Sequence, residues 1–223
     1  MIHELDLHCE DPWVIFQNWY RQASGKVPNN LRDQFFYPFR HLLRKIYPPF
    51  SLHGGDAMVL ASSTLQGHPS ARVVLFKELW DEGVVFYTNY NSRKAQELMS
   101  NPYASLVFHW ALPERQVRLE GIVEKVPVEM SESYWRSRPR ESQIGAWASN
   151  QSETIENREE LLGKVEQVRL KFKDQSVPRP THWGGFVLRA SQIEFWEACV
   201  ARLHRRRRYE KINGQWRSSL LSP

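Results

Sequence analysis

Basic side chains mark the ends of short apolar runs between residues 72 and 98. The apolar residues 73–76 and 84–87 are joined by a polar turn at 81–83, and Ser-Arg-Lys at 92–94 begins a helical pattern, which predicts strand, turn, strand and helix start. The basic residues at the ends of these elements are Arg72, Lys77, Arg93 and Lys94. Such side chains, together with the free amides of a helix N-terminus, can hold a phosphate group. We therefore expect a phosphate-bearing ligand at this segment.

A second basic segment is the run from Arg202 to Arg208. Side chains alternate along a strand, so Arg202, His204, Arg206 and Arg208 are expected on one face. One interpretation is a phosphate clamp in which His204 forms a hydrogen bond or transfers a proton. A solvated edge strand, whose charges block unwanted pairing, explains the pattern equally well. Binding of nucleic acid is a third interpretation, which is disfavoured because no helix-turn-helix, zinc-finger or RNP-like motif accompanies the run.

The composition is typical of one soluble globular domain with an excess of positive charge. The chain has 223 residues, a formal net charge of +5, 41% hydrophobic and 25% charged residues, and positive charge favours anionic partners. Its two cysteines, Cys9 and Cys199, provide no disulfide framework. The first twelve residues do not resemble a secretory signal, and no run of about 18 apolar residues occurs. We expect a cytoplasmic protein without a membrane segment.

Several common catalytic motifs are missing from the sequence. It contains no GxGxxG, GxxxxGK[ST], HExxH or GxSxG. The sequence therefore gives no support for a Rossmann, Walker, zinc-protease or serine-hydrolase site. The eight histidines are scattered. No metal site is predicted.

The pattern of elements predicts a mainly β protein with peripheral helices. Residues 1–55 are expected to form a helix, from Asp11-Pro12 to about Gly25, and an aromatic-rich connection over 26–55 with a short helix at 38–46, all packing on the body. Residues 56–223 are expected to form the main domain, with about seven antiparallel strands, helices over 92–100, 128–138 and 152–173, and a hairpin at Asn213-Gly214. Strands in this order with helices outside suggest a small barrel with helical cover. Residues 138–152 are a plausible site-forming loop or short helix.

A family resemblance is carried by a series of motifs in order along the chain. They are RVVLFK, VFYTNYNSRKA, ERQVRLEG, YWRSRPRESQIGAW, the pair Gln151-Ser152, HWGGF, IEFW and RLHRR. Together they resemble the pyridoxine (pyridoxamine) 5′-phosphate oxidase family over residues 56–223. The resemblance implies an FMN-binding split β-barrel that forms a homodimer, with FMN between the subunits. It also implies oxidation of pyridoxine or pyridoxamine 5′-phosphate to pyridoxal 5′-phosphate, with oxygen as electron acceptor and hydrogen peroxide as product.

The resemblance also assigns roles to individual residues. It implies FMN contacts at Arg72, Lys77, Tyr87, Thr88, Arg93, Lys94, Gln116, Gln151, Ser152, Trp196 and Arg206. It implies substrate contacts at Lys77, Tyr134, Arg138, Ser142, Arg202 and His204. Among these, Arg202 and His204 are expected to act in catalysis by orienting the pyridine ring beside the flavin. The alternatives are an oxidase of the same fold with another substrate, of the phenazine-pathway type, and a non-catalytic module that binds a phosphate ligand or nucleic acid.

Three features depart from the family's pattern. Ala198, Cys199 and Arg205 stand where a glycine-containing turn and an acidic residue are usual, which predicts an altered environment for the neighbouring arginines. The connection over 26–55 is longer than expected. Third, the N-terminal arm, which can cover the substrate in this family, carries no recognisable motif. Apart from these departures, Arg72 and Lys77 are an odd number of residues apart, so a bulge, a bend, or a position of Arg72 at the strand end must bring them to one site.

Overall fold

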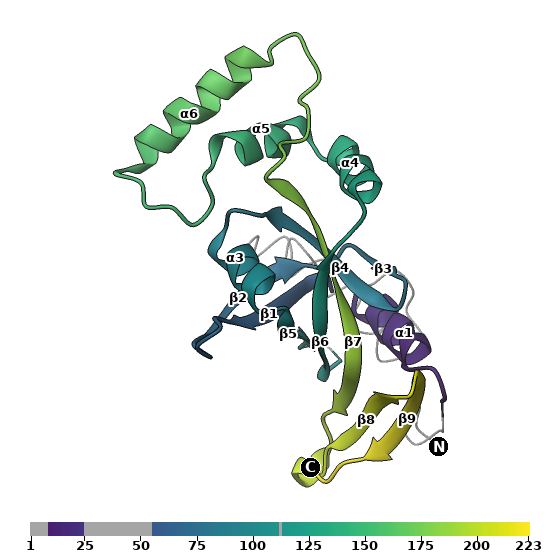
Figure 1. The fold of residues 1–223 in the computed structure, drawn as a ribbon. Coiled ribbons are helices and arrows are strands. Elements are labelled where there is room, and N and C mark those ends of the chain that lie inside the picture. Colours follow the sequence, from purple (N-terminus) through teal and green to yellow (C-terminus); the bar gives the residue numbers. More distant parts are fainter. Residues whose placement is uncertain (1–8, 25–54, 112) are drawn as a thin grey trace.

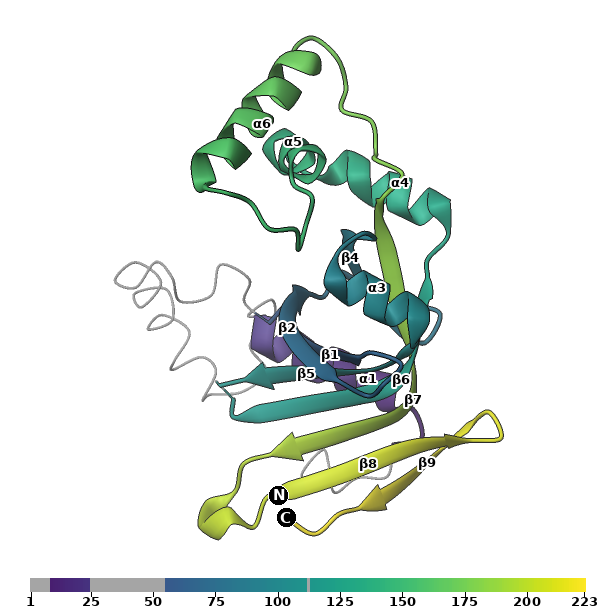
Figure 2. The same ribbon diagram turned by 60° about the vertical axis from the view of Figure 1, so that its left-hand side comes forward.

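One curled antiparallel sheet forms the body of the chain (Figures 1 and 2). The computed structural model describes residues 9–24, 55–111 and 113–223. Its strands are β1 (Ala57–Ser63), β2 (Pro69–Leu75), β3 (Glu78–Trp80), β4 (Gly83–Asn89), β5 (Tyr103–Trp110), β6 (Arg115–Lys125), β7 (Trp183–Glu197), β8 (Arg205–Ile212) and β9 (Gln215–Leu220). The order is β2-β1-β5-β6-β7-β4-β3, and β8 pairs with both β7 and β9. The predicted mainly β, antiparallel fold is confirmed, although the described residues form nine strands rather than about seven.

The last hairpin has the geometry that its sequence demands. Asn213 and Gly214 have φ of 51° and 79°, as the two central residues of a type I′ turn require. They join β8 to β9, where Ile212 pairs with Gln215. The hairpin predicted at Asn213-Gly214 is confirmed.

The longest strand, β7, corrects a predicted break. The sequence favours separate strands at HWGGFVLRA (182–190) and QIEFW (192–196), but Trp183–Glu197 form one strand of 15 residues. The register with β6 shifts between Glu120 and Gly121, where β7 carries Ser191 as an extra residue, and this β-bulge absorbs polar residues without ending the strand. A Cβ on Gly121 would lie 1.9 Å from the Arg189 carbonyl oxygen, so the close approach requires glycine.

The helices begin and end largely where the sequence indicates. They are α1 (Pro12–Ser24), α3 (Arg93–Ser100), α4 (Val128–Ser137), α5 (Arg140–Ala148) and α6 (Arg158–Lys171). Asp11 starts α1 by accepting a hydrogen bond from the Trp13 amide at 2.9 Å. The predicted start of α6 at residue 152 is wrong, because Ser152 has a φ of 80° and Asn157 caps the helix by accepting from the Glu160 amide at 2.8 Å.

Two further predictions concern the helix at 38–46 and the absence of a membrane segment. The helix expected at 38–46, and the connection over 26–55 except Gly55, lie outside the described residues. Within the ranges that the structure does describe, no helix is long and apolar enough to span a membrane.

Two hydrophobic clusters divide the described residues. The larger fills the concave side of the sheet, where α1 contributes Trp13, Phe16 and Trp19, and the Phe16 ring lies edge-on to Phe108 at 5.2 Å. The smaller lies among α4, α5 and α6 and contains Trp135, Ile144, Phe172, Val177 and Trp183. In Figure 1 these three helices extend beyond one end of β7, and the hairpin β8–β9 flanks the other end. The junction between the two clusters is therefore the place where a cleft can form.

Candidate functional site

A polar cleft of about 420 Å³ lies at this junction. We call it the cationic cleft, because two lysines and an arginine line it. Its polar and aromatic lining residues are Lys77, Tyr87, Thr88, Lys94, Tyr134, Arg138, Ser142 and Gln151. All eight are among the predicted site residues, so the fold brings together residues that are up to 74 positions apart (77 to 151).

One wall of the cationic cleft is the start of α3. The Lys94 ammonium donates to Gln151 Oε1 at 2.9 Å and to Thr88 Oγ1 at 3.3 Å, and the Arg93 amide donates to Ser152 Oγ at 3.2 Å. Burial, and next the charge of Arg72, lower the pKa of Lys94. Amides at a helix N-terminus and a desolvated ammonium form a binding place for a phosphate.

The opposite wall combines stacked rings with a buried guanidinium. Tyr87 stacks on Tyr134 with ring centroids 4.1 Å apart and on Trp183 at 5.5 Å. The Arg138 guanidinium lies over the Trp183 ring at 4.6 Å, and burial lowers the pKa of Arg138. Arg138 Nη2 donates to the Ser142 carbonyl at 3.0 Å, but its buried Nε has no hydrogen-bond partner among the described residues. A buried donor without an acceptor is costly, and an anionic ligand in the cleft would supply that acceptor.

A break between two strands sets the direction of Lys77. Strand β2 ends at Leu75 and β3 begins at Glu78, so Phe76 enters the core while Lys77 lines the cleft. The Lys77 ammonium lies 5.7 Å from the centre of the Tyr134 ring. The chain therefore bends between Arg72 and Lys77, but only Lys77 lines the cleft.

Arg72 lies beside the cleft rather than in its lining. Its guanidinium binds Ser62, Ser70 and the buried carboxylate of Glu97, with Nη2 3.2 Å from Glu97 Oε2. Glu97 also accepts from Arg93 Nε at 2.8 Å. The sequence interpretation missed Glu97, although its position four residues after Arg93 on a helix is a signal for an ion pair.

A second group of predicted residues lies in one row across three strands. Gln116 of β6 pairs with Trp196 of β7, which pairs with Arg206 of β8, so the three side chains project from the same face of the sheet. We call them the Trp196 row. Arg206 Nε donates to Glu194 Oε1 at 2.8 Å, and Arg118 Nη2 donates to Glu194 Oε2, also at 2.8 Å. The sequence interpretation missed Glu194, whose signal is its place two residues before Trp196 on the same strand face.

The segment before β8 corrects the predicted cationic ladder. Val200–Arg202 form a 3₁₀ turn in which Ala201 and Arg202 have φ of 59° and 61°, and β8 begins only at Arg205. Arg202 therefore does not share a strand face with Arg206 and Arg208. The predicted ladder is wrong because the left-handed backbone of this turn cannot continue a strand.

His204 is fixed at the end of this turn. The Cys199 amide donates to His204 Nδ1 at 3.2 Å, and the imidazole lies 4.7 Å from the Trp196 ring. Because Nδ1 accepts a hydrogen bond, the neutral ring carries its proton on Nε2. His204 thus offers an Nε2–H donor beside the Trp196 row.

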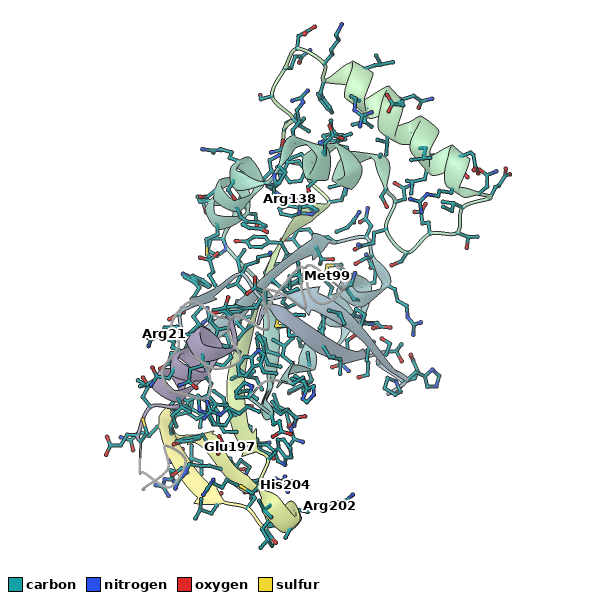
Figure 3. The ribbon with its side chains drawn as sticks, turned by 180° about the vertical axis from the view of Figure 1, so that it is seen from behind. Arg21, Met99, Arg138, Glu197, Arg202 and His204 are labelled. Atoms are coloured by element: carbon teal, nitrogen blue, oxygen red, sulfur yellow. The ribbon has the colours of Figure 1, made fainter. Side chains whose placement is uncertain are left out.

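The cationic cleft and the Trp196 row lie at opposite ends of β7. Trp183 belongs to the cleft end and Trp196 to the row, 13 residues further along the strand, which corresponds to roughly 40 Å at about 3.3 Å per residue. Figure 3 shows Arg138 below the helices in the upper part of the molecule, and Arg202 and His204 at its lower end. One chain therefore does not bring the predicted FMN and substrate contacts into a single site.

Comparison with known proteins identifies the family. Residues 51–172 match the family model described as pyridoxamine 5′-phosphate oxidase. The chain belongs to the pyridoxamine 5′-phosphate oxidase family. Residues 183–223 match the model of the pyridoxine 5′-phosphate oxidase C-terminal dimerisation region.

Individual members of the pyridoxamine 5′-phosphate oxidase family are similar over nearly the whole chain. A pyridoxine/pyridoxamine 5′-phosphate oxidase from Nostoc punctiforme is 43% identical over 222 residues, covering 99% of this chain and 91% of the relative. One from Paraburkholderia phytofirmans is 49% identical over 216 residues, covering 96% and 89%. Among solved structures, PhzG from Burkholderia lata 383, in complex with tetrahydrophenazine-1-carboxylic acid, has a TM-score of 0.81 at 26% identity and covers 100% of this chain and 98% of its own. The predicted split-barrel fold is thus confirmed.

The two arginines at the start of β8 both have partners in this structure. Arg205, where the family resemblance leads one to expect an acidic residue, pairs with Glu197 at 3.5 Å and donates to Cys199 Sγ at 3.5 Å. Arg206 keeps a carboxylate partner in Glu194, 2.7 Å from its Nη2. The missing acidic side chain at 205 therefore does not leave Arg206 without a counter-ion.

Proposed function

We propose that this chain is an FMN-dependent oxidase that converts pyridoxine or pyridoxamine 5′-phosphate to pyridoxal 5′-phosphate, with oxygen as electron acceptor and hydrogen peroxide as product. Besides family membership, the observation that carries this proposal is the pair of separate phosphate-binding groups in the cationic cleft. One is the start of α3 with Lys94, and the other is Arg138 with its unpartnered buried Nε. A reaction that brings a phosphorylated cofactor and a phosphorylated substrate together in one site needs two phosphate-binding groups.

The start of α3 is the proposed holder of the FMN phosphate. Lys94, the helix amides and Gln151 present donors on one side of the cleft, and Arg93 adds an exposed guanidinium. Bound FMN would supply the redox chemistry by accepting a hydride, while the protein supplies position and charge. Arg72, Lys77, Tyr87, Thr88 and Ser152 complete the FMN contacts proposed for this half of the site.

Arg138 is the proposed centre of the substrate phosphate site. Its unpartnered Nε and the neighbouring Ser142 hydroxyl can both donate to a phosphate oxygen, and charge-assisted hydrogen bonds of this kind are strong. Tyr134 adds a ring wall and Lys77 a second positive charge. These groups thus offer the hydrogen-bond donors and the positive charge that binding of a phosphate monoester requires.

A homodimer completes the site. The matched dimerisation region, residues 183–223, contains Trp196, Arg202, His204 and Arg206. These residues are too far from the cationic cleft of their own chain to contact a ligand bound there. We propose that FMN lies at the subunit interface, between the cationic cleft of one chain and the Trp196 row of the other. Arg202 and His204 of the second chain would then orient the pyridine ring, with the His204 Nε2–H as a donor.

The arginine run has partners that argue against a nucleic-acid function. Arg205, Arg206 and Arg208 form ion pairs with Glu197, Glu194 and Glu210, at 3.5, 2.7 and 3.0 Å. Charges compensated in this way contribute little to counterion release. We therefore propose a small phosphorylated ligand as the anion that the chain binds. A cytoplasmic location stays a prediction.

Anaerobic mixing tests the proposed reaction. The purified dimer with bound FMN is mixed with pyridoxine 5′-phosphate without oxygen, and we expect the flavin absorbance to bleach and then return when oxygen is admitted. The proposal is contradicted if the protein takes up no FMN. It is also contradicted if neither pyridoxine nor pyridoxamine 5′-phosphate reduces the bound flavin. Flavin bleached only by a compound of the tetrahydrophenazine-1-carboxylic acid type would favour the second candidate, an oxidase of the phenazine-pathway type, which the structural similarity to PhzG supports.

Variants test the assigned roles. Arg202→Ala or His204→Ala should lower turnover and leave FMN bound, whereas Arg93→Ala should weaken FMN binding. Equal effects of all three on both properties would contradict the assignment.

A further inference from the structure

A buried carboxylate lies behind the proposed FMN phosphate site. The Glu97 side chain, on α3, is only 6% exposed, and both of its oxygens accept hydrogen bonds. Ser62 Oγ donates to Oε2 at 2.6 Å and Arg93 Nε donates to Oε1 at 2.8 Å, while Ser70 and Arg72 also donate to Oε2. One carboxylate therefore connects two of the predicted FMN contacts, Arg72 and Arg93, to β1 and β2.

We infer that Glu97 is a positioning residue for the phosphate of the flavin nucleotide. The inference rests on the proposed FMN function. Glu97 binds Arg93 through Nε, so this bond does not use the Nη groups, and the Arg93 side chain is 65% exposed. An arginine held by its Nε offers a preorganised pair of donors to a phosphate.

The charges of the group support the same role. Three cations, Arg72, Arg93 and Lys94, together with the single anion Glu97 give a net charge of about +2, which matches the −1.5 to −2 of a phosphate monoester near pH 7. Burial, and next the charge of Arg72, already lower the pKa of Lys94. Removing Glu97 would add repulsion among the three cations and free the Arg93 side chain to take other rotamers.

Arg72 has a different part in this arrangement. Its Nη1 donates to Ser62 and to the Leu60 carbonyl, the latter at 3.4 Å, and its Nη2 donates to Ser70 and Glu97. These bonds use the terminal donors of Arg72 within the protein. Arg72 therefore contributes mainly charge and support, and Arg93 together with Lys94 contributes the donors that reach the phosphate.

The decisive comparison is between FMN and riboflavin, which has the same ring but no phosphate. We expect Glu97→Ala to weaken FMN binding to the full-length dimer by about 10- to 100-fold, the range for loss of a hydrogen bond to a charged group. Riboflavin binding should change by less than about threefold. Affinities are measured by quenching of flavin fluorescence, so the readout does not depend on turnover.

Further variants separate charge from geometry. Glu97→Gln keeps the shape and one acceptor oxygen, so its loss of FMN affinity should be smaller than that of Glu97→Ala. Adding Glu97→Ala to Arg93→Ala should cost much less than it costs alone, because the two side chains act as one unit. Glu160→Gln, which breaks the exposed Glu160–Lys164 pair of α6, is the matched control and should change neither affinity.

Each outcome has a separate meaning. Equal weakening of FMN and riboflavin would overturn the inference in favour of a general structural role, and an unchanged preference for FMN in both Glu97 variants would also overturn it. If Glu97→Ala does not fold, Glu97→Gln and the Arg93 double variant carry the test. A wild-type protein that binds neither flavin contradicts the proposed function itself, which distinguishes that failure from failure of the role of Glu97.

Discussion

A mixture of two impaired variants should recover activity if each site is built from two chains. Arg138→Ala damages the cationic cleft, and His204→Ala damages the turn beside the Trp196 row. The two residues lie at opposite ends of β7, which runs for roughly 40 Å between them, so they cannot serve one site within one chain. In a mixed dimer, one site receives both defects and the other receives neither.

The size of the recovery follows from counting sites. Random exchange of subunits gives mixed dimers as about half of all dimers, and each has one intact site of two, so the mixture should show about one quarter of wild-type activity. Mixed dimers purified through two different tags should show about one half. Co-expression of the tagged variants and assay of pyridoxal 5′-phosphate formation measure both values.

The control mixture uses two defects in the same half of the site. Arg138→Ala mixed with Lys77→Ala should stay at the level of the separate variants, because every cleft is then damaged. Recovery in this control, or no recovery in the Arg138 and His204 mixture with mixed dimers present, would refute a site shared between subunits.

Three further predictions concern two buried carboxylates and the close contact between Gly121 and the backbone of β7. Burial alone would raise the pKa of Glu97, but hydrogen bonds from Ser62, Ser70 and two arginines lower it to about 2. The resulting stabilisation is about 1–2 kcal/mol, discounted because Arg93, one of these donors, has a side chain that is 65% exposed to solvent. It should be present above about pH 4.3 and be lost as the pH falls toward 2, so urea unfolding of the wild type should depend more steeply on pH in this range than that of Glu97→Gln. Gly121→Ala should lower the free energy of unfolding by about 2 kcal/mol or more, since its Cβ would meet a carbonyl oxygen at 1.9 Å, whereas Gly163→Ala in α6, with nothing within 4 Å, should be neutral or stabilising by up to about 1 kcal/mol; thermal unfolding of both checks this, and similar melting temperatures would contradict it. Glu194→Gln, at a carboxylate only 3% exposed, should destabilise the chain by about 1–3 kcal/mol and weaken FMN binding, and flavin titration with an unchanged affinity would show that Arg206 does not need this partner.

The parts of the fold that the sequence predicts depend on local chemistry. The Asp11 cap starts α1, Asn213-Gly214 forms its turn, and the alternation of Gln116 and Arg118 with apolar residues gives β6 one polar face. Each of these signals is complete within a few neighbouring residues. The polar and aromatic residues that line the cationic cleft are also among the predicted ligand contacts, because the motifs that carry the family resemblance contain them.

The features that the sequence did not predict depend on contacts between distant segments. The bulge at Ser191 exists because β6 and β7 pair on both sides of it. The two neighbouring polar residues Ser191 and Gln192 do not reveal from the sequence that the strands pair on both sides. The turn at Ala201 requires positive φ in residues that rarely adopt it. Glu97 and Glu194 are acidic residues in a helix and a strand, where exposure is the usual expectation, and only the fold encloses them with arginines.

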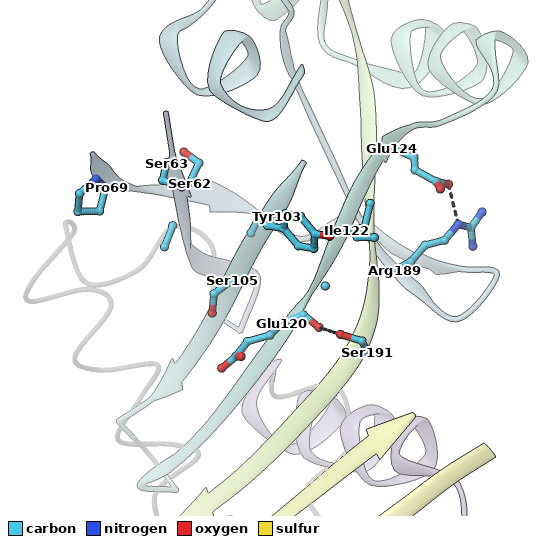
Figure 4. Close-up of a pocket in the computed structure, with 13 residues that line it drawn as sticks. Ser62, Ser63, Pro69, Tyr103, Ser105, Glu120, Ile122, Glu124, Arg189 and Ser191 are labelled. Atoms are coloured by element: carbon cyan, nitrogen blue, oxygen red, sulfur yellow. Dashed lines mark hydrogen bonds and ion pairs between the residues drawn. The ribbon is translucent and has the colours of Figure 1, made fainter. Parts of the chain in front are cut away.

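The outer face of the sheet offers a surface that continues from the Trp196 row. A groove of about 610 Å³ lies on this face. Figure 4 shows its lining residues, among which Arg189 binds Glu124 and Ser191 donates to the Glu120 carbonyl. Glu120 follows Gln116 on the same face of β6. Neither the groove nor its lining residues were among the predicted site residues.

The length of β7 makes cofactor retention a collective property of the assembly. One continuous strand carries Trp183 at one end and Trp196 at the other, so in the proposed dimer every copy of β7 takes part in both sites. Dilution that separates the subunits would dismantle the two sites together, and by mass action each bound flavin would hold the subunits together. Cofactor occupancy and subunit association would then titrate as one equilibrium, with more flavin retained at higher protein concentration.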